Sequence, residues 1–221
     1  MPSIKFHAHA TFELNGAGQR ILIDPWFRKN PAFGYLPEDL NPTLILVTHN
    51  HGDHVGDAIE LSKTYGVPIV TTPSAARHYE GEGATTHRLH LGGSLKFDWG
   101  DIKCVPAVHD SPLAIGETWR VELGAPCGFV VTLEGYKVYH AGDTALYGDM
   151  ALFAPVDLAL LPIDGNYVME ADDAVRAAGL LQAKRVFPMH WRDQAPEAFS
   201  ASARAASFDS EVMAPGQTIE L

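Results

Sequence analysis

Four side chains able to bind metal occur within six consecutive residues of this chain, and this cluster restricts the fold more than any other feature. The four residues are His49, His51, Asp53 and His54. They follow the apolar, strand-like run Leu44–Thr48 and precede the helix-like run Val55–Tyr65. The first two histidines share a face of an extended backbone, and the other two residues reach an adjacent point after the turn at Gly52. The spacing predicts a strand-to-helix loop that serves two neighbouring metal ions.

Three further segments repeat this form, in which an apolar strand is followed by one metal-type residue. CVPAVHD carries His109, KVYHAGDT carries Asp143 and RVFPMHW carries His190. A single histidine after a strand is more often a structural residue than a ligand, and it is the repetition that favours one shared site. The combined set of imidazoles and carboxylates suits zinc and leaves manganese or iron open as alternatives.

Composition limits the function classes. The 221 residues, 46% of them hydrophobic, suffice for one large domain or two small ones. No linker divides the chain convincingly, so we expect a single domain over residues 1–221. Sixteen Lys and Arg against 27 Asp and Glu give a net charge of −11, which disfavours nucleic acid as a partner.

No apolar run approaches the roughly 18–20 residues that cross a bilayer, and the first residues lack a signal-peptide pattern. We therefore expect a cytoplasmic protein that has a small-molecule substrate and no membrane partner, and a homo-oligomer is left open. Cys104 and Cys127 lie in apolar, strand-like segments and are predicted to be buried free thiols.

The apolar pattern predicts an α/β fold in which short strands outnumber helices. Strands are expected at Ser3–Phe6, Arg20–Ile23, Leu44–Thr48, Pro68–Thr71, Ser94–Phe97, Ile102–Pro106, Phe129–Leu133, Lys137–His140, Leu158–Leu161 and Arg185–Pro188. Helices are expected at Val55–Tyr65, Ser74–Tyr79, Ala171–Gln182 and Pro196–Ala206. The first half looks hairpin-like and the second alternates strand and helix, which favours an α/β sandwich. The stretch between His109 and Cys127 fits no element and is our candidate for a substrate-facing lid.

The THNHGDH segment resembles the HxHxDH signature of the metallo-β-lactamase fold. ILIDPW, CGFVVTLEGYKVYHAGDTALYGDM, LALLPIDGNYVMEADDA and RVFPMHW resemble segments of a bacterial group of metal-dependent hydrolases, which is similar at a distance to the ascorbate-6-phosphate lactonases. The resemblance implies a four-layer αβ/βα sandwich. A histidine at position 190, where the lactam-degrading enzymes have cysteine, disfavours β-lactamase activity.

The same resemblance implies a division of the ligands between two metal ions. It assigns His49, His51 and His109 to one ion, Asp53, His54 and His190 to the other, and Asp143 to a bridging position. Three positions depart from the pattern of the group, since Ala8, Asn50 and Asp164 stand where glycine is usual. None of them removes a ligand, so they bear on the shape of the pocket and not on metal binding.

Two metal ions that share a water generate hydroxide at neutral pH, and this bridging hydroxide is the expected nucleophile. The chain has no GxSxG motif, in agreement with such a mechanism. We therefore predict a metal-dependent hydrolase of a small ester, lactone or phosphoester, with Asp53, Asp143 and His9 as catalytic residues. The alternatives are an oxidoreductase with one iron on the same scaffold and a non-catalytic metal-binding protein.

Several residues have two open interpretations. Asp24, in LIDPW, orients a ligand histidine or merely starts a turn before Pro25. His9 touches substrate or a ligand, or is an ordinary strand-end histidine. Asp110 and Asp164 are equal candidates for the acid that protonates the leaving group.

Trp119 and Trp191 are expected to form an apolar wall beside the metals. A cation that recognises an anionic substrate group would be one of Arg77, Arg120 and Arg192. The trio Asn166, Tyr167 and Met169 lines the pocket or packs the core. Asp57 is expected in the first turn of a helix, and five histidines are expected to be structural or solvated, namely His7, His78, His87, His90 and His140.

Overall fold

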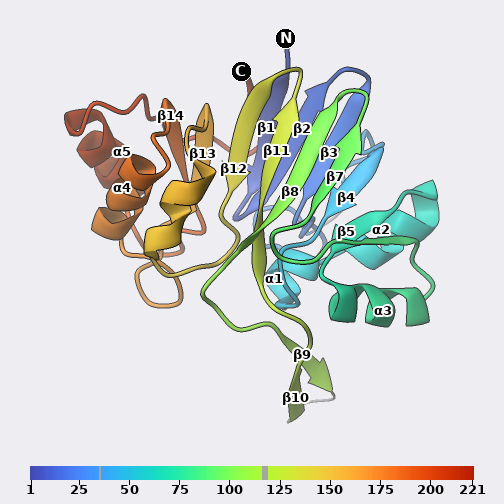
Figure 1. Cartoon of the computed structure of the whole chain (residues 1–221). Coiled ribbons are helices and arrows are strands. Elements are labelled where there is room, and N and C mark those ends of the chain that lie inside the picture. Colours follow the sequence, from blue (N-terminus) through green and yellow to red (C-terminus); the bar gives the residue numbers. More distant parts are fainter. Residues whose placement is uncertain (35, 116–118) are drawn as a thin grey trace.

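Two β-sheets face each other in the computed structural model, which describes residues 1–34, 36–115 and 119–221 (Figure 1). The first sheet has the strand order β15 (Thr218–Glu220), β1 (Ser3–Ala8), β2 (Thr11–Gly16), β3 (Gln19–Ile23), β4 (Leu44–Leu46), β5 (Ile69–Thr71) and β6 (Thr86–Arg88). The second has the order β14 (Arg185–Met189), β13 (Leu158–Pro162), β12 (Tyr136–His140), β11 (Cys127–Leu133), β8 (Gly100–Pro106) and β7 (Ser94–Phe97). All ten predicted strands are confirmed to within two residues at each end.

Each sheet is antiparallel on one side and parallel on the other. Strands β1 to β3 and strands β7, β8, β11 and β12 pair antiparallel, whereas β3 to β6 and β12 to β14 pair parallel. The crossovers between parallel strands carry α1 (Gly52–Val55), α2 (Ala58–Tyr65), α3 (Pro73–Gly81), the 3₁₀-helix η1 (Gly148–Phe153) and α4 (Ala171–Leu180). The expectation of a mostly hairpin-like first half is therefore confirmed only for β1 to β3 and for β7 and β8, because α2 and α3 already return the chain for parallel pairing in the first half.

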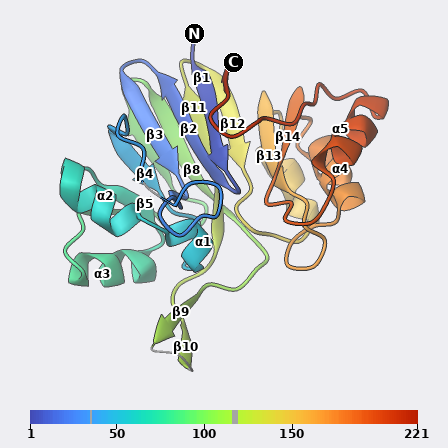
Figure 2. The same cartoon turned by 180° about the vertical axis from the view of Figure 1, so that it is seen from behind.

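Strand alternation divides the apolar side chains between the two faces of each sheet. Ile21 and Ile23 of β3 lie in the core between the sheets, while Leu22 faces the other way and packs in the smaller core under α2 and α3. On the second sheet, α4 and α5 (Pro196–Ala205) bury Ala177 and Phe199. Helices thus lie on the outer side of both sheets, which confirms the predicted αβ/βα sandwich (Figure 1, Figure 2).

The helix predicted over Val55–Tyr65 is interrupted at Gly56. This glycine has φ 42°, and a side chain on it would collide with the carbonyl of Pro25. The interruption moves Asp57 from the first turn to the N-cap position of α2, where its Oδ2 accepts the backbone N–H groups of Phe27 and Arg28 at 2.8 and 3.1 Å. Asp57 therefore anchors the loop that follows β3.

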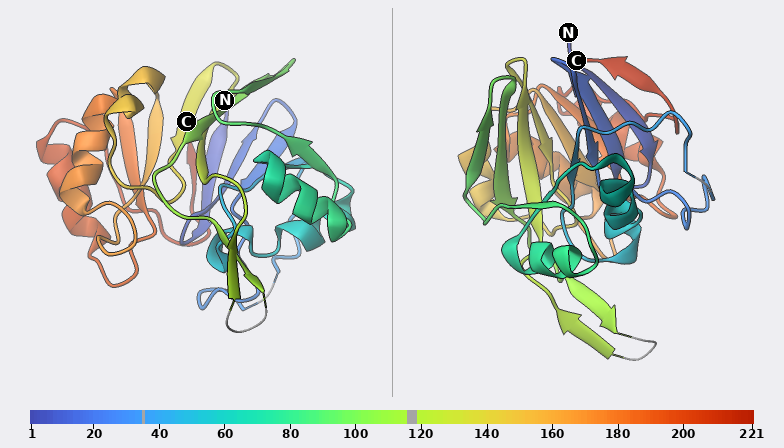
Figure 3. Two further views of the ribbon diagram at one scale, coloured as in Figure 1. Left: turned by 60° about the horizontal axis from the view of Figure 1, so that its bottom comes forward. Right: turned by 90° about the vertical axis from the view of Figure 1, so that its right-hand side faces the viewer.

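The segment for which the sequence predicted no element contains a β-hairpin. β9 (Pro112–Ile115) pairs antiparallel with β10 (Trp119–Glu122), and the pair belongs to neither main sheet. Figure 3 shows the hairpin projecting from the body of the molecule. Residues 116–118 lie outside the described part, and the lid stays a prediction, because the pairing of β9 with β10 does not test it.

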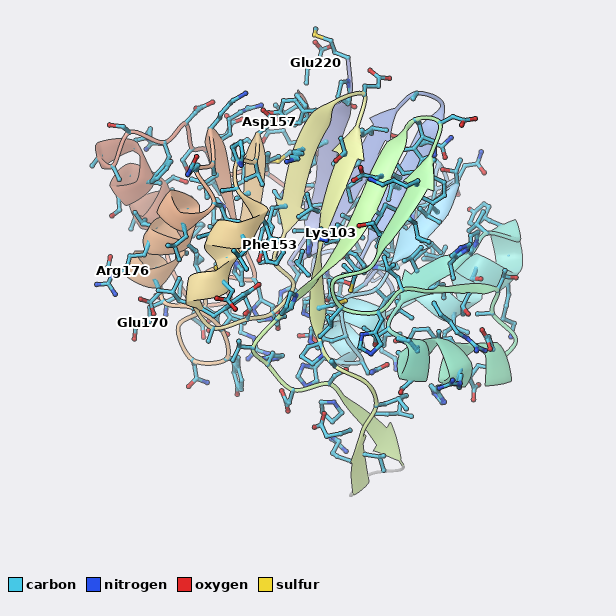
Figure 4. The ribbon with its side chains drawn as sticks, viewed as in Figure 1. Lys103, Phe153, Asp157, Glu170, Arg176 and Glu220 are labelled. Carbon is cyan, nitrogen blue, oxygen red and sulfur yellow. The ribbon has the colours of Figure 1, made fainter. Side chains whose placement is uncertain are left out.

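The two chain termini lie side by side at the end of the sandwich opposite the hairpin (Figure 1). Charged side chains such as Glu170 and Arg176 extend outward from the helical layer on the second sheet (Figure 4). Among the described residues, no helix has the length and apolar character that crossing a membrane requires. Both cysteines are buried and unpaired, as predicted.

Candidate metal centre

The loops that carry the candidate site residues meet at one edge of the sandwich. Strands β1, β3 and β4 run in one direction in the first sheet, as do β8, β12, β13 and β14 in the second. Loops at the carboxyl ends of such strands gather at one edge of their sheet. They carry His9 after β1, Asp24 after β3, His49 to His54 after β4, His109 after β8, Asp143 after β12, Asp164 after β13 and His190 after β14.

Three histidine nitrogens converge in a first cluster. His49 Nε2 lies 2.9 Å from His51 Nδ1, which lies 3.3 Å from His109 Nε2. Two nitrogens that bind one tetrahedral zinc ion at roughly 2.0–2.1 Å are about 3.3–3.4 Å apart, so this spacing is close to that of a metal-binding set. Together with Asp143, these residues form a group whose ligand atoms all lie within 4.8 Å of one another.

A second cluster has the same property and consists of His9, Asp53, His54 and His190. His9 Nε2 lies 3.3 Å from Asp53 Oδ2, and the rings of His9 and His190 are 4.0 Å apart between centroids. These two histidines have φ angles of 58° and 49°, and the N–H of His190 donates to the carbonyl of His9 at 3.0 Å. Non-glycine residues seldom adopt this conformation, and it is enriched at functional sites. The structure thus places His9 among the predicted ligands and not at an ordinary strand end.

Asp143 lies between the two clusters. Its Oδ2 is 3.7 Å from His109 Nε2 and 3.9 Å from His49 Nε2 in the first cluster. The same atom is 3.1 Å from His190 Nε2 and 3.3 Å from His54 Nε2 in the second. One carboxylate oxygen therefore faces nitrogens of both groups, as a bridging ligand would.

A buried carboxylate behind the clusters, Asp24, orients one histidine of each. Asp24 Oδ2 accepts from His54 Nδ1 at 2.7 Å and from the hydroxyl of Thr48 at 2.7 Å. Because the Thr48 hydroxyl donates its only hydrogen in the bond to Asp24, it can act only as an acceptor toward His49 Nδ1, which lies 3.0 Å away. Both histidines are then protonated at Nδ1 and present the lone pair of Nε2 to the centre. Asp24 thus has the orienting position and is more than a turn residue, and no sequence pattern indicated the role of Thr48.

Burial and neighbouring charges set the protonation of the centre. Burial lowers the pKa of His49 well below its ordinary value, and the charge of His54 adds to this effect. Burial by itself also lowers the pKa of His54, but Asp143 and Asp24 outweigh it and raise this pKa well above the ordinary value. Burial opposes ionisation of Asp143, yet His54 and His190 hold its pKa well below the usual range. These opposed effects favour an ionised Asp143 carboxylate between the two clusters.

Buried polar atoms that lack a hydrogen-bond partner provide a test of whether a cation fits. Among the described residues these atoms include His9 Nε2, His54 Nε2 and Asp143 Oδ1, which all belong to the two clusters. Leaving a buried donor or acceptor unpaired costs about 1–3 kcal/mol. Divalent cations would satisfy these atoms, and the nitrogen and carboxylate donors match what zinc binds. The residues present therefore fit two metal ions.

A cavity of about 360 Å³ opens over the clusters. Of the two carboxyl groups considered as the acid, Asp110 lines this cavity, with Oδ1 3.6 Å from His51 Nε2. Asp164 lies behind the cluster instead, with Oδ2 3.9 Å from His190 Nδ1 and 3.7 Å from Arg192 Nε. The geometry therefore distinguishes two residues that the sequence left equal.

Arg192 is the one of the three predicted arginines that lines this cavity, whereas Arg77 lies in α3 and Arg120 in β10. Its guanidinium carbon lies 4.6 Å above the ring centroid of Tyr167, which lines the same cavity. Arg192 has φ 44° and a side chain that is 46% exposed. A positively charged group is thus held at the mouth of the centre by an aromatic face and by Asp164.

Other predicted residues are divided between the centre and the core. Asn50 is buried and joins the ligand loop to the base of the hairpin, since its Nδ2 donates to Ser111 Oγ at 2.8 Å and to the carbonyl of Leu123 at 2.7 Å. Met169 packs in the core, which agrees with the second of its two interpretations. Asn166 lines a neighbouring cavity. Trp119 is in β10, and its side chain lies outside the described part.

The histidines expected to be structural or solvated belong to neither of the two clusters. His140 is buried and its Nε2 contacts the carbonyl of Ala10 at 2.9 Å, while His7 contacts Glu13 at 3.3 Å. His87 and His90 are exposed, and His78 is half-buried in α3.

Comparisons with known proteins agree with this arrangement. The model of the beta-lactamase superfamily domain matches residues 3–190. A UPF0173 metal-dependent hydrolase of Opitutus terrae is 40% identical over 99% of both chains, and one of Thermus thermophilus is 40% identical over the full length of both. The solved structure of Igni18, a metallo hydrolase from the archaeon Ignicoccus hospitalis, superposes with a TM-score of 0.88 at 29% identity, covering 99% of this chain and 97% of that one. The chain therefore belongs to the beta-lactamase superfamily and, within it, to the UPF0173 family of metal-dependent hydrolases.

Proposed function

We propose that the chain hydrolyses a small ester, lactone or phosphoester with two divalent metal ions held at the two clusters. His49, His51 and His109 would hold one ion, Asp53, His54 and His190 the other, and Asp143 both. The pair would lower the pKa of a shared water from about 15.7 to about 7 and polarise the substrate oxygen. The position of Asp143 Oδ2, within 3.9 Å of nitrogens from both clusters, carries this proposal. The donor set favours zinc, with manganese and iron as alternatives.

The chain's own residues have separate tasks in this proposal. Asp53 and Asp143 supply ionised carboxylates at the centre, and His9 contacts Asp53 in the second cluster. Asp110 is better placed than Asp164 to give a proton to the leaving group, because it lines the cavity over the clusters. Arg192 binds an anionic part of the substrate.

Removal of the Arg192 charge should weaken the binding of anionic substrates selectively. A hydrogen bond to a charged group contributes about 1.5–3 kcal/mol, so Arg192→Ala is expected to raise KM for an anionic ester roughly 10- to 150-fold. KM for a neutral ester of the same size should change by less than about threefold, because a neutral ester has no anionic group for Arg192 to bind in the wild type or in the variant. Steady-state kinetics on the two esters measure this difference. Equal effects on both would contradict the assignment.

Elemental analysis of the protein, purified without chelators or a metal-binding tag, tests the metal centre directly. We expect two zinc or manganese ions per chain, and His51→Ala should lose about one of them because it removes a donor of the first cluster only. One iron per chain would favour the oxidoreductase instead. Two ions with no turnover of esters, lactones or phosphoesters would favour a non-catalytic metal-binding protein. No metal after reconstitution would contradict the centre itself.

A further inference from the structure

A second cavity, of about 470 Å³, adjoins the second cluster. Its walls are largely apolar and include Phe6, Trp26, Pro31, Ala32, Trp191 and Pro215. Small-molecule sites have volumes of roughly 300–1,000 Å³ and mostly apolar walls with a few polar groups, and this cavity matches that description. The sequence predicted Trp191 as an apolar wall beside the metals, but it did not single out Trp26.

The cavity shares lining residues with the centre. His9 and Asp53 of the second cluster both line it. Asp53 and Arg192 also line the cavity over the clusters, so the two spaces share residues. A molecule whose reacting group lies at the clusters can therefore extend an apolar part between the tryptophans while a charged part stays beside Arg192.

Fixed neighbours hold the tryptophan walls in place. The ring of Trp191 lies 5.5 Å from that of Phe6, which is buried. The ring of Trp26 meets that of His9 edge-on at 5.1 Å, and its backbone N–H donates to Thr11 Oγ1 at 3.2 Å. The Trp26 carbonyl accepts from Asn30 Nδ2 at 3.1 Å. The cavity is thus preformed, which reduces the entropy that a ligand loses by ordering its site.

We propose that this cavity binds an apolar alkyl, acyl or ring substituent of the substrate. The chain then acts on amphipathic small molecules, with the hydrolysable group at the two clusters and the apolar substituent between Trp26 and Trp191. The inference rests on the proposed function, because that function places the reacting group beside Asp53.

Binding of alkylphosphonates to the metal-containing protein tests the cavity without any turnover. Methylphosphonate and butylphosphonate carry the same charged head and differ by three methylenes. Each buried methylene contributes about 0.8 kcal/mol, which is roughly fourfold in Kd, so butylphosphonate should bind about 60-fold more tightly. Isothermal titration calorimetry measures both constants. Equal binding of the two phosphonates would overturn the proposal.

Three variants and one control show whether the preference for butylphosphonate arises in this cavity. Trp26→Ala and Trp191→Ala should each reduce the butyl-to-methyl ratio at least about fivefold, since each removes apolar wall area. Trp99→Ala is the matched control, because Trp99 stacks on Phe97 and does not line the cavity, and it should leave the ratio unchanged. Ala32→Trp fills the exposed rim of the cavity and should bring the butyl-to-methyl ratio close to one. This variant keeps both tryptophans, so it tests the cavity even if a tryptophan-to-alanine variant fails to fold. An unchanged ratio in Ala32→Trp would overturn the proposal.

Hydrolysis assays, combined with these titrations, separate this inference from the proposed function. If no ester, lactone or phosphoester is hydrolysed but the ratio follows the variants, the cavity stands and the hydrolytic proposal fails. If esters are hydrolysed while both phosphonates bind equally, the hydrolytic proposal stands and the cavity assignment is wrong.

Discussion

Asp143→Ala should abolish hydrolysis and lower the metal content of the protein. The variant removes the carboxylate oxygen that faces His109 and His49 on one side and His190 and His54 on the other. A metal ion supplies several kcal/mol of transition-state stabilisation, and each 1.36 kcal/mol is tenfold in rate, so we expect kcat/KM to fall by about 10³-fold or more. Metal content should fall below two ions per chain, as measured by elemental analysis after dialysis.

A matched histidine variant controls for unspecific effects. His78 lies in α3 and belongs to neither cluster, so His78→Ala should retain metal and activity within about twofold of the wild type. Activity of Asp143→Ala within about tenfold of the wild type would contradict a centre with two metal ions. A large loss in His78→Ala would show that the structural histidines had been misinterpreted.

Asp24→Ala should damage both stability and metal binding. Asp24 is fully buried and accepts from Thr48 N, Thr48 Oγ1 and His54 Nδ1. Removing one partner of a buried charged pair costs about 3–5 kcal/mol, which lowers Tm by roughly 6–20 °C in a chain of this size. Loss of a group that orients a ligand histidine weakens metal affinity about 10- to 100-fold. Calorimetric unfolding and metal titration measure the two effects.

Glu13 provides the control for a buried carboxyl outside the centre. Its Oε2 contacts His7 Nε2 at 3.3 Å, and its Oε1 lies 3.5 Å from Arg20 Nε. Glu13→Gln should lower Tm without changing metal affinity, whereas Asp24→Ala changes both. If Asp24→Ala kept the metal affinity of the wild type, the link from Asp24 through Thr48 to His49 would have no role in orienting ligands.

Local periodicity is what made the strands predictable. The runs at Ile21–Ile23 and Leu158–Leu161 are apolar on consecutive positions because both faces of their strands are covered. β2 was missed although its first four residues are buried. Its polar residues Thr11 and Glu13 are buried through hydrogen bonds to Asp24 and His7, so the buried run is not a continuous apolar run in the sequence.

A long-range contact explains why the expected helix is interrupted. The break after Val55 depends on the approach of the Pro25 carbonyl to Gly56, a contact between segments about thirty positions apart. This break does not follow from the local residue pattern. The hairpin of β9 and β10 was also not predicted, although its two strands are close in the sequence.

The sequence by itself determined the ligand-type residues, their order and the strands that deliver them, since these follow from residue chemistry and local alternation. Only the tertiary structure decided how they face one another. It turned Asp24 toward His54 and Thr48, placed Asp110 and not Asp164 over the clusters, and brought His9 beside His190. The physical reason is that these relations depend on how the two sheets pack against each other and on the left-handed backbone at His9, Asp24 and His190, which distant contacts impose and no local pattern encodes.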